Sequence, residues 1–454
     1  MLKLIIQILL AVVFANRYII GTLLMWAKGK EFDKVLSEST DWQPGVTITI
    51  PMYNEGEGIF RTVKSLLEQE YPKELLKIIV VDDCSTDDSY AWAKRAEELA
   101  PDRVTVMQNA ENMGKRRGLI RAVRRADTEI IVSVDSDVVV AKDAIAQLMR
   151  RFTRPEIAAV GGRVHVLNKH ENWLTRMQTI KYFFGYEYLK NVERYFSTVM
   201  CLSGCLTAYR REVLLELEPI LEDRNLYGIP IKYGEDRFLT RQIVKKGYGT
   251  VLTMDAVCHT IAPNTLAKYF SQQLRWRRSI IVDYMGGITH VWRLHPLVCL
   301  HYFAIFALIM AYPALVVESI FVGALWETMF IHLGIVTLLG AIYSLQMKNI
   351  PEEDQVSPLN FMAMVLVMPV VYMILTPLAL FTLGTGSWET RGTPKAEEAA
   401  EPVRQPEPVL APAAPMASPT SARTAHLGAA NINSVAARSV EAPFGSLDKA
   451  EAQL

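Results

Sequence analysis

The chain has 454 residues, half of them apolar, and its 48 Lys and Arg residues balance its 48 Asp and Glu residues at a formal net charge of zero. The length allows two or three domains, and the apolar content is high for a protein without membrane segments. Because there is no net positive charge, composition gives no electrostatic reason to expect a nucleic-acid partner.

The chain begins with an apolar stretch. Residues 2–24 are about as long as a bilayer requires, and no small-residue cleavage site follows their apolar run. We therefore predict one transmembrane span within residues 1–30 rather than a signal peptide, although Asn16 and Arg17 interrupt it. Two lysines close behind the span predict that its C-terminal end lies in the cytoplasm.

Residues 40–262 alternate apolar runs with segments of helical spacing. The apolar runs predict strands at residues 46–51, 77–83, 104–108 and 129–137, and the segments between them predict helices at residues 56–70, 87–99 and 118–126. This alternation is typical of an α/β fold with a doubly wound, mostly parallel sheet. We expect this segment to be one cytosolic domain.

Acidic residues end two of the predicted strands. Ligands of such sheets bind beyond the carboxyl ends of the strands, and the sequence has Asp82 and Asp83 after one strand and Asp135 and Asp137 after another. Two carboxylates at spacing i, i+2 suit one hard divalent cation, which could neutralise a diphosphate. The alternative is that these acids are turn residues. Neither dinucleotide nor P-loop glycine motifs are present.

A basic cluster precedes one of the predicted helices. The stretch NMGKRRG (112–118) places Lys115, Arg116 and Arg117 just before the helix at residues 118–126. Basic groups at a helix start oppose the helix dipole unless an anion lies there. A diphosphate would supply that anion, and a solvated charged turn is the alternative.

Two motifs lie ahead of the later apolar stretches. The stretch YGEDRFLT (233–240) predicts a helix that starts after Gly234, with Glu235 and Asp236 in its first turn. Residues 263–296 contain SQQLRWRRS and mix aromatic with basic side chains at helical spacing, which predicts amphipathic helices at the cytoplasmic membrane surface. A lipid-facing anchor with no role at a site is the alternative for the second segment.

The C-terminal part divides into an apolar region and a tail. Within residues 297–384 we predict two spans before residue 347, with a break near residues 326–327, and a third apolar stretch with two prolines that is re-entrant or kinked. Residues 392–454 are rich in Ala and Pro, and we predict a disordered tail.

The five cysteines form no C-x-x-C pair, which predicts free thiols in a reducing cytosol. They are Cys84, Cys201, Cys205, Cys258 and Cys299. A zinc site at Cys201 and Cys205 is a weaker alternative, because a structural zinc requires four closely held ligands.

Seven short stretches occur in an order and spacing that together carry a resemblance. They are IPMYNEG (50–56), VVDDCSTDDS (80–89), VDSD (134–137), SGC (203–205), GEDR (234–237), QQLRW (272–276) and SWETR (387–391). From residue 46 to residue 276, with a weaker match at the C-terminal end, the chain resembles the family 2 inverting glycosyltransferases, specifically the membrane-embedded processive polysaccharide synthases. This resemblance implies a GT-A-type catalytic domain.

The resemblance implies a set of residues that bind the nucleotide-sugar donor. They are Tyr53 and Glu55 in the nucleotide pocket, Asp83 at the uracil, Lys115 at the diphosphate, Asp135 at the nucleotide, Arg275 at the leaving phosphate, and Trp388 and Arg391 as a cap over the nucleotide. It also implies that Asp137 ligates Mg²⁺ or Mn²⁺. Glu389 stands where the related motif has Gly.

For the acceptor side, the resemblance implies that Asp236 is the catalytic base, because inverting transfer requires a group that takes the proton of the attacking hydroxyl. The acceptor-binding residues that it implies are Ser203, Gly204, Cys205, Gln272 and Trp276. The pair Gly204–Cys205 replaces a Gly-Pro that is frequent in these synthases, which puts the acceptor specificity in doubt.

The expected function is a processive, inverting β-glycosyltransferase of the plasma membrane with a cytoplasmic catalytic domain. It would bind a UDP-sugar donor, a growing polysaccharide and the lipid bilayer, and secrete its product. UDP-N-acetylglucosamine is the favoured donor, alone or alternating with UDP-glucuronic acid. A glucan synthase, a non-processive lipid-linked transferase and a catalytically silent membrane scaffold are the alternatives. The oligomeric state is unknown from the sequence.

Overall fold

The computed structural model describes residues 21–385 and three isolated positions before them, 4, 8 and 19. Most of the predicted N-terminal span and all of the predicted tail therefore lie outside the described residues, as do Trp388 and Arg391. The described part starts with helix α2 (Gly21–Ser37) and continues into the sheet domain.

The centre of the fold is an eight-stranded sheet with the strand order β3-β2-β1-β4-β7-β6-β10-β5. The strands are β1 (Val46–Met52), β2 (Leu76–Asp82), β3 (Val104–Gln108), β4 (Ile130–Val134), β5 (Val139–Val140), β6 (Ile157–Val166), β7 (Leu206–Arg210) and β10 (Gly249–Thr260). Neighbours pair in parallel except where β7 lies against β4 and β6, and where β5 lies against β10. This confirms the predicted α/β class with a mostly parallel sheet.

The composition of β1 explains its central place. Its sequence VTITIPM is rich in β-branched residues, and all seven side chains are buried. A strand with both faces buried must be covered by helices on both sides. Each fully buried Val or Ile of this kind contributes roughly 1.5–3 kcal/mol of transfer free energy to folding.

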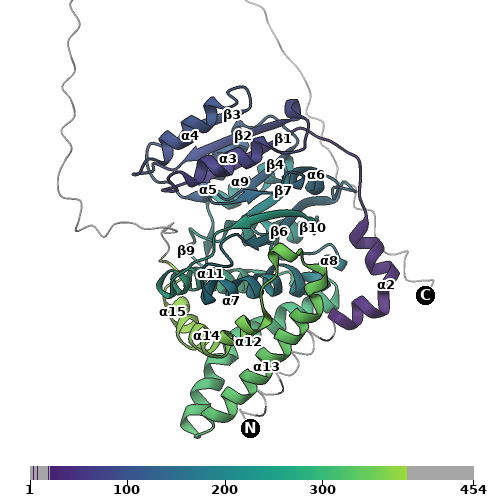
Figure 1. Ribbon diagram of the computed structural model, residues 1–454, viewed down its shortest axis with the longest axis vertical. Coiled ribbons are helices and arrows are strands. Elements are labelled where there is room, and N and C mark those ends of the chain that lie inside the picture. Colours follow the sequence, from purple (N-terminus) through teal and green to yellow (C-terminus); the bar gives the residue numbers. More distant parts are fainter. Residues whose placement is uncertain (1–3, 5–7, 9–18, 20, 386–454) are drawn as a thin grey trace, which may run out of the picture. The chain divides into compact units, whose positions relative to one another are not determined.

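Helices cover both faces of the sheet (Figure 1). One face is packed by α3 (Gly58–Leu67), α4 (Ser89–Glu98) and α6 (Ala144–Met149). The other face is packed by α5 (Lys115–Arg125), α9 (Arg211–Glu222) and α10 (Glu235–Lys245). The result is a three-layer domain, and the carboxyl ends of β1, β2 and β4 open onto one edge.

The start of α5 differs from the prediction. The helix begins at Lys115, three residues earlier than expected, so that the basic cluster forms its first turn. Asp83 offsets this unfavourable charge, because its carboxylate accepts hydrogen bonds from the backbone N–H groups of Met113 (2.8 Å) and Gly114 (2.7 Å) just ahead of the helix. The chain itself therefore supplies an anion that the sequence assigned to a ligand.

Below the sheet, α7 (Trp173–Tyr182) and α11 (Leu266–Gly287) lie between it and the apolar helices (Figure 1). Short helical elements complete this layer: η3 (Phe183–Glu187), η4 (Tyr188–Lys190), α8 (Asn191–Tyr195) and η5 (Val291–Arg293). A small hairpin, β8 (Asn225–Leu226) and β9 (Ile229–Pro230), stands apart from the main sheet, and η2 (Lys73–Leu75) precedes β2.

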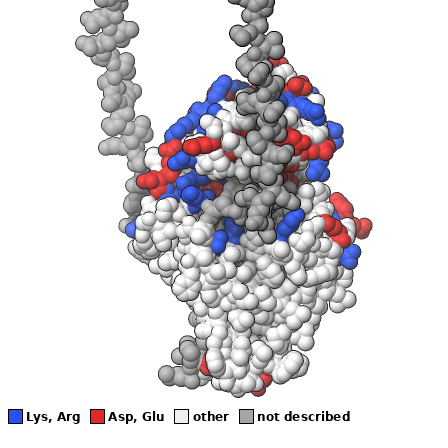
Figure 2. Space-filling model, turned by 90° about the vertical axis from the view of Figure 1, so that its left-hand side faces the viewer, with Lys and Arg blue, Asp and Glu red and all other residues white. Residues whose placement is uncertain are grey.

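Among the described residues, three segments are long and apolar enough to cross a membrane. They are α12 (Pro296–Phe321), α13 (Leu325–Gln346) and a run of short helices between residues 352 and 381. That run comprises η7 (Glu352–Asp354), η8 (Pro358–Ala363), α14 (Met364–Val370), η9 (Val371–Leu375) and α15 (Thr376–Phe381), and η6 (Met347–Asn349) precedes it. On the face in Figure 2, the part of the molecule that carries these helices is nearly free of charged side chains.

Both ends of the third segment contact the catalytic domain. At one end, the Asp354 carboxylate accepts a hydrogen bond from Lys169 (2.8 Å) and contacts the ring of His165 on β6. At the other end, the Leu383 carbonyl accepts a hydrogen bond from the Tyr233 hydroxyl (2.8 Å). The segment thus leaves the domain and comes back to it.

Candidate active site

A cavity of about 1640 Å³ runs from the carboxyl edge of the sheet to the apolar helices. Most of the site residues predicted from the sequence line this cavity. They are Glu55, Lys115, Asp135, Asp137, Ser203, Gly204, Cys205, Asp236, Gln272, Arg275 and Trp276. Because these residues come from widely separated parts of the chain, only the fold brings them together.

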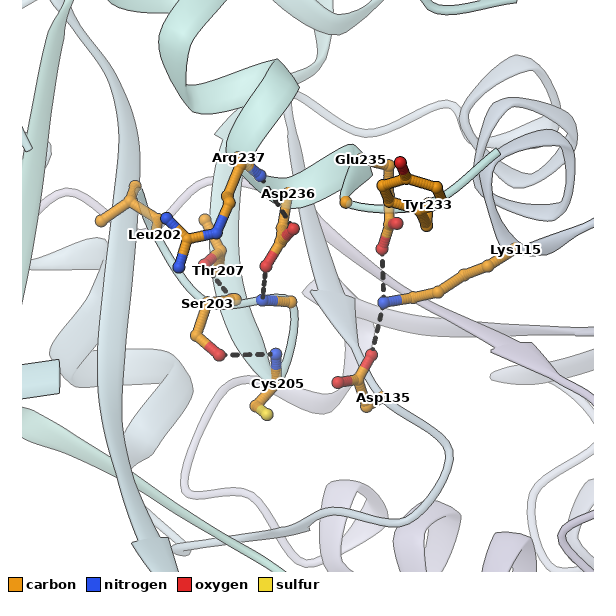
Figure 3. Close-up of polar contacts among 12 residues, drawn as sticks. Lys115, Asp135, Leu202, Ser203, Cys205, Thr207, Tyr233, Glu235, Asp236 and Arg237 are labelled. Atoms are coloured by element: carbon orange, nitrogen blue, oxygen red, sulfur yellow. Dashed lines mark hydrogen bonds and ion pairs between the residues drawn. The ribbon is translucent and has the colours of Figure 1, made fainter. Parts of the chain in front are cut away.

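Lys115 joins two carboxylates at the edge of the sheet (Figure 3). Its ammonium group lies 2.7 Å from Asp135 Oδ1 and 2.5 Å from Glu235 Oε1, with all three side chains mostly buried. Burial opposes the charge of Lys115, but the carboxylates of Asp135, Glu235 and Asp236 outweigh it and raise the pKa of Lys115 well above its usual value. The same ion pair outweighs burial at Asp135 and lowers the pKa of that carboxyl group.

The sequence missed the role of Glu235 in this cluster. The sequence predicts Glu235 only as a first-turn residue of a helix, next to Asp236. The structure instead places its carboxylate on Lys115, which outweighs burial and lowers the pKa of Glu235. A charge cluster between two helix starts has no sequence signature, because α5 and α10 are more than a hundred residues apart.

Asp137 lies in the loop after β4, on the cavity wall. Its Oδ2 accepts a hydrogen bond from the hydroxyl of Thr260 (3.1 Å), the last residue of β10. The neighbouring Ser136 donates a hydrogen bond to Glu55 (3.1 Å), which ties this loop to the end of β1. Asp135 and Asp137 thus present carboxylate oxygens to one cavity, and such hard oxygen donors fit Mg²⁺ or Mn²⁺.

Asp236 lies in the first turn of α10, as the sequence predicted. Its Oδ1 accepts a hydrogen bond from the backbone N–H of Arg237 (2.8 Å), and its Oδ2 accepts one from the N–H of Gly204 (3.4 Å; Figure 3). The first turn of a helix stabilises an ionised carboxylate. These two N–H groups therefore fix the orientation of the Asp236 carboxylate, which lines the cavity.

The loop before β7 has little room for side chains. A Cβ atom on Gly204 would lie 2.9 Å from the Lys115 ammonium nitrogen, so glycine is the residue that leaves this ion pair undisturbed. Next to it, the Cys205 N–H donates to the Ser203 hydroxyl (3.2 Å). Burial raises the pKa of the Cys205 thiol well above its usual value, so this cysteine is a neutral wall residue. All five cysteines are free thiols.

Helix α11 supplies aromatic and basic side chains to the cavity. The Trp276 ring lies 5.9 Å from the Tyr182 ring of α7, measured between centroids. Gln272 and Arg275 line the same wall. Tyr182 was not predicted as a site residue, because an aromatic side chain in an aromatic-rich helix reads from sequence as ordinary core.

Helices α10 and α11 pack against each other at two buried contacts. Gly234 precedes α10 with φ = +67°, and a Cβ atom there would lie 2.0 Å from the hydroxyl oxygen of Ser279 on α11. Farther along, Arg241 of α10 forms a buried ion pair with Asp283 of α11 at 2.7 Å. The helix that carries Asp236 and the helix that carries Trp276 therefore meet at two buried points.

The structure places two predicted donor residues differently. Tyr53 follows β1 and Asp83 follows β2, and neither is among the described residues that line the cavity. The Asp83 carboxylate is buried and accepts three hydrogen bonds, from Asn109 (2.7 Å), Met113 and Gly114. In this arrangement it anchors the loop ahead of α5, and its contact with a base stays a prediction.

A second polar cluster lies on the other side of β10. His165, His259 and Asp354 each place a ligand atom within 4.8 Å of the other two. Lys169 donates to Asp354, and Arg163 forms an ion pair with Glu187 at 2.8 Å beside His165. Because cations of the chain already balance both carboxylates, the cluster ties the segment after α13 to the sheet rather than presenting an open donor set.

Relatives and solved structures resemble parts of the chain. It is 34% identical over 241 residues to an N-acetylglucosaminyltransferase of Rhizobium meliloti (strain 1021), a match that covers 53% of this chain and 56% of the relative. It is 33% identical over 248 residues to an N-acetylglucosaminyltransferase of Azorhizobium caulinodans, covering 54% of this chain and 62% of the relative. The chain thus matches little more than half the length of these relatives.

A solved structure shares the fold. The mannosyltransferase PcManGT from Pyrobaculum calidifontis, in complex with GDP-Man and Mn²⁺, superimposes with a TM-score of 0.55 at 22% identity, over 82% of this chain and 99% of that one. This likeness shows the GT-A fold. The family described as "Glycosyltransferase like family 2" matches residues 44–279, which is more than half of the chain. The chain therefore belongs to the family 2 glycosyltransferases.

Proposed function

We propose that the chain is an inverting β-glycosyltransferase that transfers N-acetylglucosamine from its UDP conjugate to a growing glycan, repeatedly and without releasing it. The observation that carries the proposal is the cavity that joins carboxylates at the sheet edge to aromatic side chains of α11 and then to the apolar helices. The similarity to N-acetylglucosaminyltransferases supports this donor sugar.

In the proposed reaction, Asp236 takes the proton of the acceptor hydroxyl. The hydroxyl oxygen forms a bond to the anomeric carbon, and the bond from that carbon to the phosphate oxygen breaks, so that UDP leaves with the electron pair. Attack from the face opposite UDP converts an α-linked donor into a β-glycoside. The N–H groups of Gly204 and Arg237 support this role, because they orient the Asp236 carboxylate.

The donor end needs positive charge to accept a diphosphate. Lys115 donates to Asp135 and Glu235, and an ammonium group has a third N–H for a phosphate oxygen. Asp137 and Asp135 would hold Mg²⁺ or Mn²⁺, which would offset charge on the leaving diphosphate. Tyr53, Glu55 and Asp83 are proposed for the nucleoside, and Trp388 and Arg391, outside the described residues, for its cap.

The acceptor end needs flat apolar faces and hydrogen-bonding groups. Trp276 offers an aromatic face for a pyranose ring, and Tyr182 backs it. Ser203, Gly204, Cys205 and Gln272 line the wall beside it, and Arg275 is proposed to stabilise the leaving phosphate. Beyond Trp276 the cavity continues between α12 and α13, which supports a route for an elongating product.

We further propose that the catalytic domain is cytoplasmic and that α12 and α13 cross the membrane as a hairpin. The contact of Asp354 with His165 supports this, because it returns the chain to the catalytic domain after α13. The contact of Leu383 with Tyr233 supports a re-entrant third segment, since one full crossing would separate its two ends. Cysteines introduced one at a time at the exposed positions Glu353 and Thr385, next to these two contacts, should react only after the cytoplasmic face is exposed. Reaction of either in intact cells would contradict this topology.

Membranes from cells that express the chain provide the test of the reaction. Radiolabelled UDP-N-acetylglucosamine with Mg²⁺ or Mn²⁺ should yield a high-mass product, and Asp236→Asn membranes should not. A pulse of labelled donor followed by unlabelled donor distinguishes processive from distributive elongation, because only processive elongation keeps the label in few, long chains. Transfer of one sugar to a lipid, without elongation, would overturn the proposal.

A further inference from the structure

Two loops at the carboxyl edge of the sheet have unusual backbone conformations. Residues 53–57 follow β1, and residues 83–88 follow β2. In these loops Asn54 and Gly56 both have φ = +53°, and Cys84 has φ = +63°. Residues with a side chain are uncommon at such angles, and they keep them where the surrounding structure enforces them, often at functional sites. The contacts that enforce these conformations therefore bear on the function of this edge.

Ser89, the first residue of α4, holds the loop after β1. Its hydroxyl oxygen accepts hydrogen bonds from the backbone N–H groups of Glu55 (2.7 Å) and Gly56 (2.7 Å). The same hydroxyl donates to the Asp87 carboxylate, which also accepts a hydrogen bond from the Ser89 N–H (3.0 Å). A hydroxyl group has one donor and two acceptor sites, so Ser89 uses all of them. Because Ser89 is fully buried, water does not compete for these bonds.

The loop after β2 holds the loop after β1 at a second point. The Asn54 N–H donates a hydrogen bond to the Ser85 hydroxyl (3.0 Å). The Asn54 side-chain oxygen accepts one from the N–H of Thr86 (2.9 Å). These bonds and those of Ser89 bracket the strained stretch from both sides, so that the two loops form one unit.

Glu55 extends this unit to the loop after β4. Its carboxylate accepts the hydrogen bond from the Ser136 hydroxyl, and Ser136 stands between Asp135 and Asp137, the two carboxylates proposed for the metal ion. These four residues line the cavity, whereas Ser89 is not among the described residues that do so. Ser89 therefore touches the backbone of a residue in the donor site without lining the site itself.

We infer that Ser89, oriented by Asp87, is a positioning residue for the donor, because it holds the loop after β1 in its strained conformation. Glu55 and, through Ser136, the two metal-binding carboxylates are then in place before the nucleotide arrives. The inference rests on the proposed function in that the donor is a UDP-sugar. Because a strained loop is held for binding rather than for folding, its release should weaken donor binding more than it weakens the fold.

The test is the binding of UDP and Mn²⁺ by the full-length protein in lipid nanodiscs, measured by calorimetry. Ser89→Ala should raise the Kd of UDP about tenfold, as expected from the loss of two ordinary hydrogen bonds. Backbone hydrogen exchange in residues 53–57 should become faster in the same variant. The melting temperature should change little, since Glu55 and Gly56 are only half-buried and their freed N–H groups can reach water.

Kinetics on membranes give a second readout for Ser89→Ala. The KM for the UDP-sugar should rise by more than kcat falls, because the lost interactions serve binding of the donor. A variant that loses melting temperature and kcat together, with the Kd of UDP unchanged, would show a merely structural role for Ser89 and overturn the inference.

Asp87 allows a test by conservative rescue. Asp87→Ala removes the acceptor of the Ser89 hydroxyl and should weaken UDP binding severalfold. Asp87→Asn retains a side-chain oxygen that can accept the same hydrogen bonds, so it should restore most of the affinity. If Asp87→Asn binds UDP as weakly as Asp87→Ala, the charge of Asp87 acts on the ligand, and the positioning role is wrong.

Ser65→Ala is the matched control, because the Ser65 hydroxyl also joins a helix to another segment. It donates to the Thr62 carbonyl (2.8 Å) within α3 and accepts a hydrogen bond from the N–H of Val140 on β5 (3.2 Å). The control variant should keep wild-type UDP affinity and wild-type exchange in residues 53–57. An equal loss of UDP affinity in Ser65→Ala and Ser89→Ala would overturn the inference.

The failure of this inference differs from that of the proposed function, because UDP binding does not depend on which sugar is transferred or how often. If N-acetylglucosamine is transferred and Ser89→Ala has wild-type UDP affinity, only the positioning role is wrong. If Ser89→Ala weakens UDP binding but the wild type transfers no N-acetylglucosamine, the proposed function is wrong and the positioning role is supported.

Discussion

Two acidic pairs follow strands at the same edge of the sheet, and they are used differently. Asp82, the last residue of β2, and Asp83, the residue after it, accept hydrogen bonds from the chain itself. The donors to Asp82 include the N–H of Ser85 (3.2 Å) and the amide of Gln108 (2.9 Å). Asp135 and Asp137, after β4, face the cavity. We therefore expect an acid near the end of a strand to serve a ligand where it lines the cavity, and to stabilise a loop where groups of the chain surround it.

The largest effect on sugar transfer should come from replacing Asp236, which lines the cavity. Asp236→Asn should lower the rate of sugar transfer by about 10²–10⁴-fold, because it removes the proposed general base. The binding of UDP and the thermal stability should change little. Sugar transfer by membranes and UDP binding by purified protein are the two measurements, and a variant that keeps most of its activity would remove Asp236 from the mechanism.

Asp137→Asn should have the next largest effect. Sugar transfer at low Mn²⁺ concentration should fall by about 100-fold, because a bound metal contributes several kcal/mol of charge stabilisation. A titration with Mn²⁺ should show partial recovery at high concentration, and the melting temperature should stay near that of the wild type. Asp82→Asn is the matched control, and it should leave the metal requirement as it is in the wild type.

Asp83→Asn should instead act on stability. Its buried carboxylate accepts three hydrogen bonds, two of them from backbone N–H groups, and an amide cannot accept all three without turning its own N–H groups toward donors. We expect a loss of about 2 kcal/mol in the free energy of unfolding. If stability is unchanged and UDP binding is lost, Asp83 binds the nucleotide rather than stabilising the loop.

The smallest effect concerns the contribution to stability of the contact between His165 and the Asp354 carboxylate. Burial disfavours a charged His165 ring, but its hydrogen bonds to Asp354 and Glu187 outweigh burial and raise its pKa above 6.5. A raised pKa gives stability that is fully present below pH 6.5 and is lost as the pH rises through the raised value. Thermal unfolding should thus show the highest stability below pH 6.5 and a progressive loss of stability as the pH rises above it.

His165→Gln is the control for this pH dependence, because it removes the titrating ring. The variant should have a flatter stability profile over the same range. If it keeps the full pH dependence, the loss of stability belongs to another group, and the cluster at Asp354 is not its source.

The sequence predicts the sheet well and the charge partners poorly. β1 and β4 can be predicted because strands that are buried on both faces have nearly continuous apolar sequences. The start of α10 can be predicted from Gly234 and the two acids that follow it. Glu235 lies more than a hundred residues from its partner Lys115, and His165 and Lys169 lie more than a hundred residues from their partner Asp354. No local pattern encodes such pairs.

The first turn of α5 illustrates the limit in detail. Its basic residues correctly indicated that an anion lies nearby, because the helix dipole makes the sequence unfavourable without one. They could not indicate that Asp83, Asp135 and Glu235 are those anions.

The two buried meeting points of α10 and α11 have a consequence for protein engineering. Replacing only the aromatic residues of α11 by those of another enzyme would also shift the start of α10, which carries Asp236. Gly234 packs directly against Ser279 of α11, and Arg241 of α10 forms its buried ion pair with Asp283 of α11. The smallest unit that can be transplanted between such enzymes is therefore residues 234–287 as a whole. Within that unit, acceptor preference and proton transfer would be inherited together.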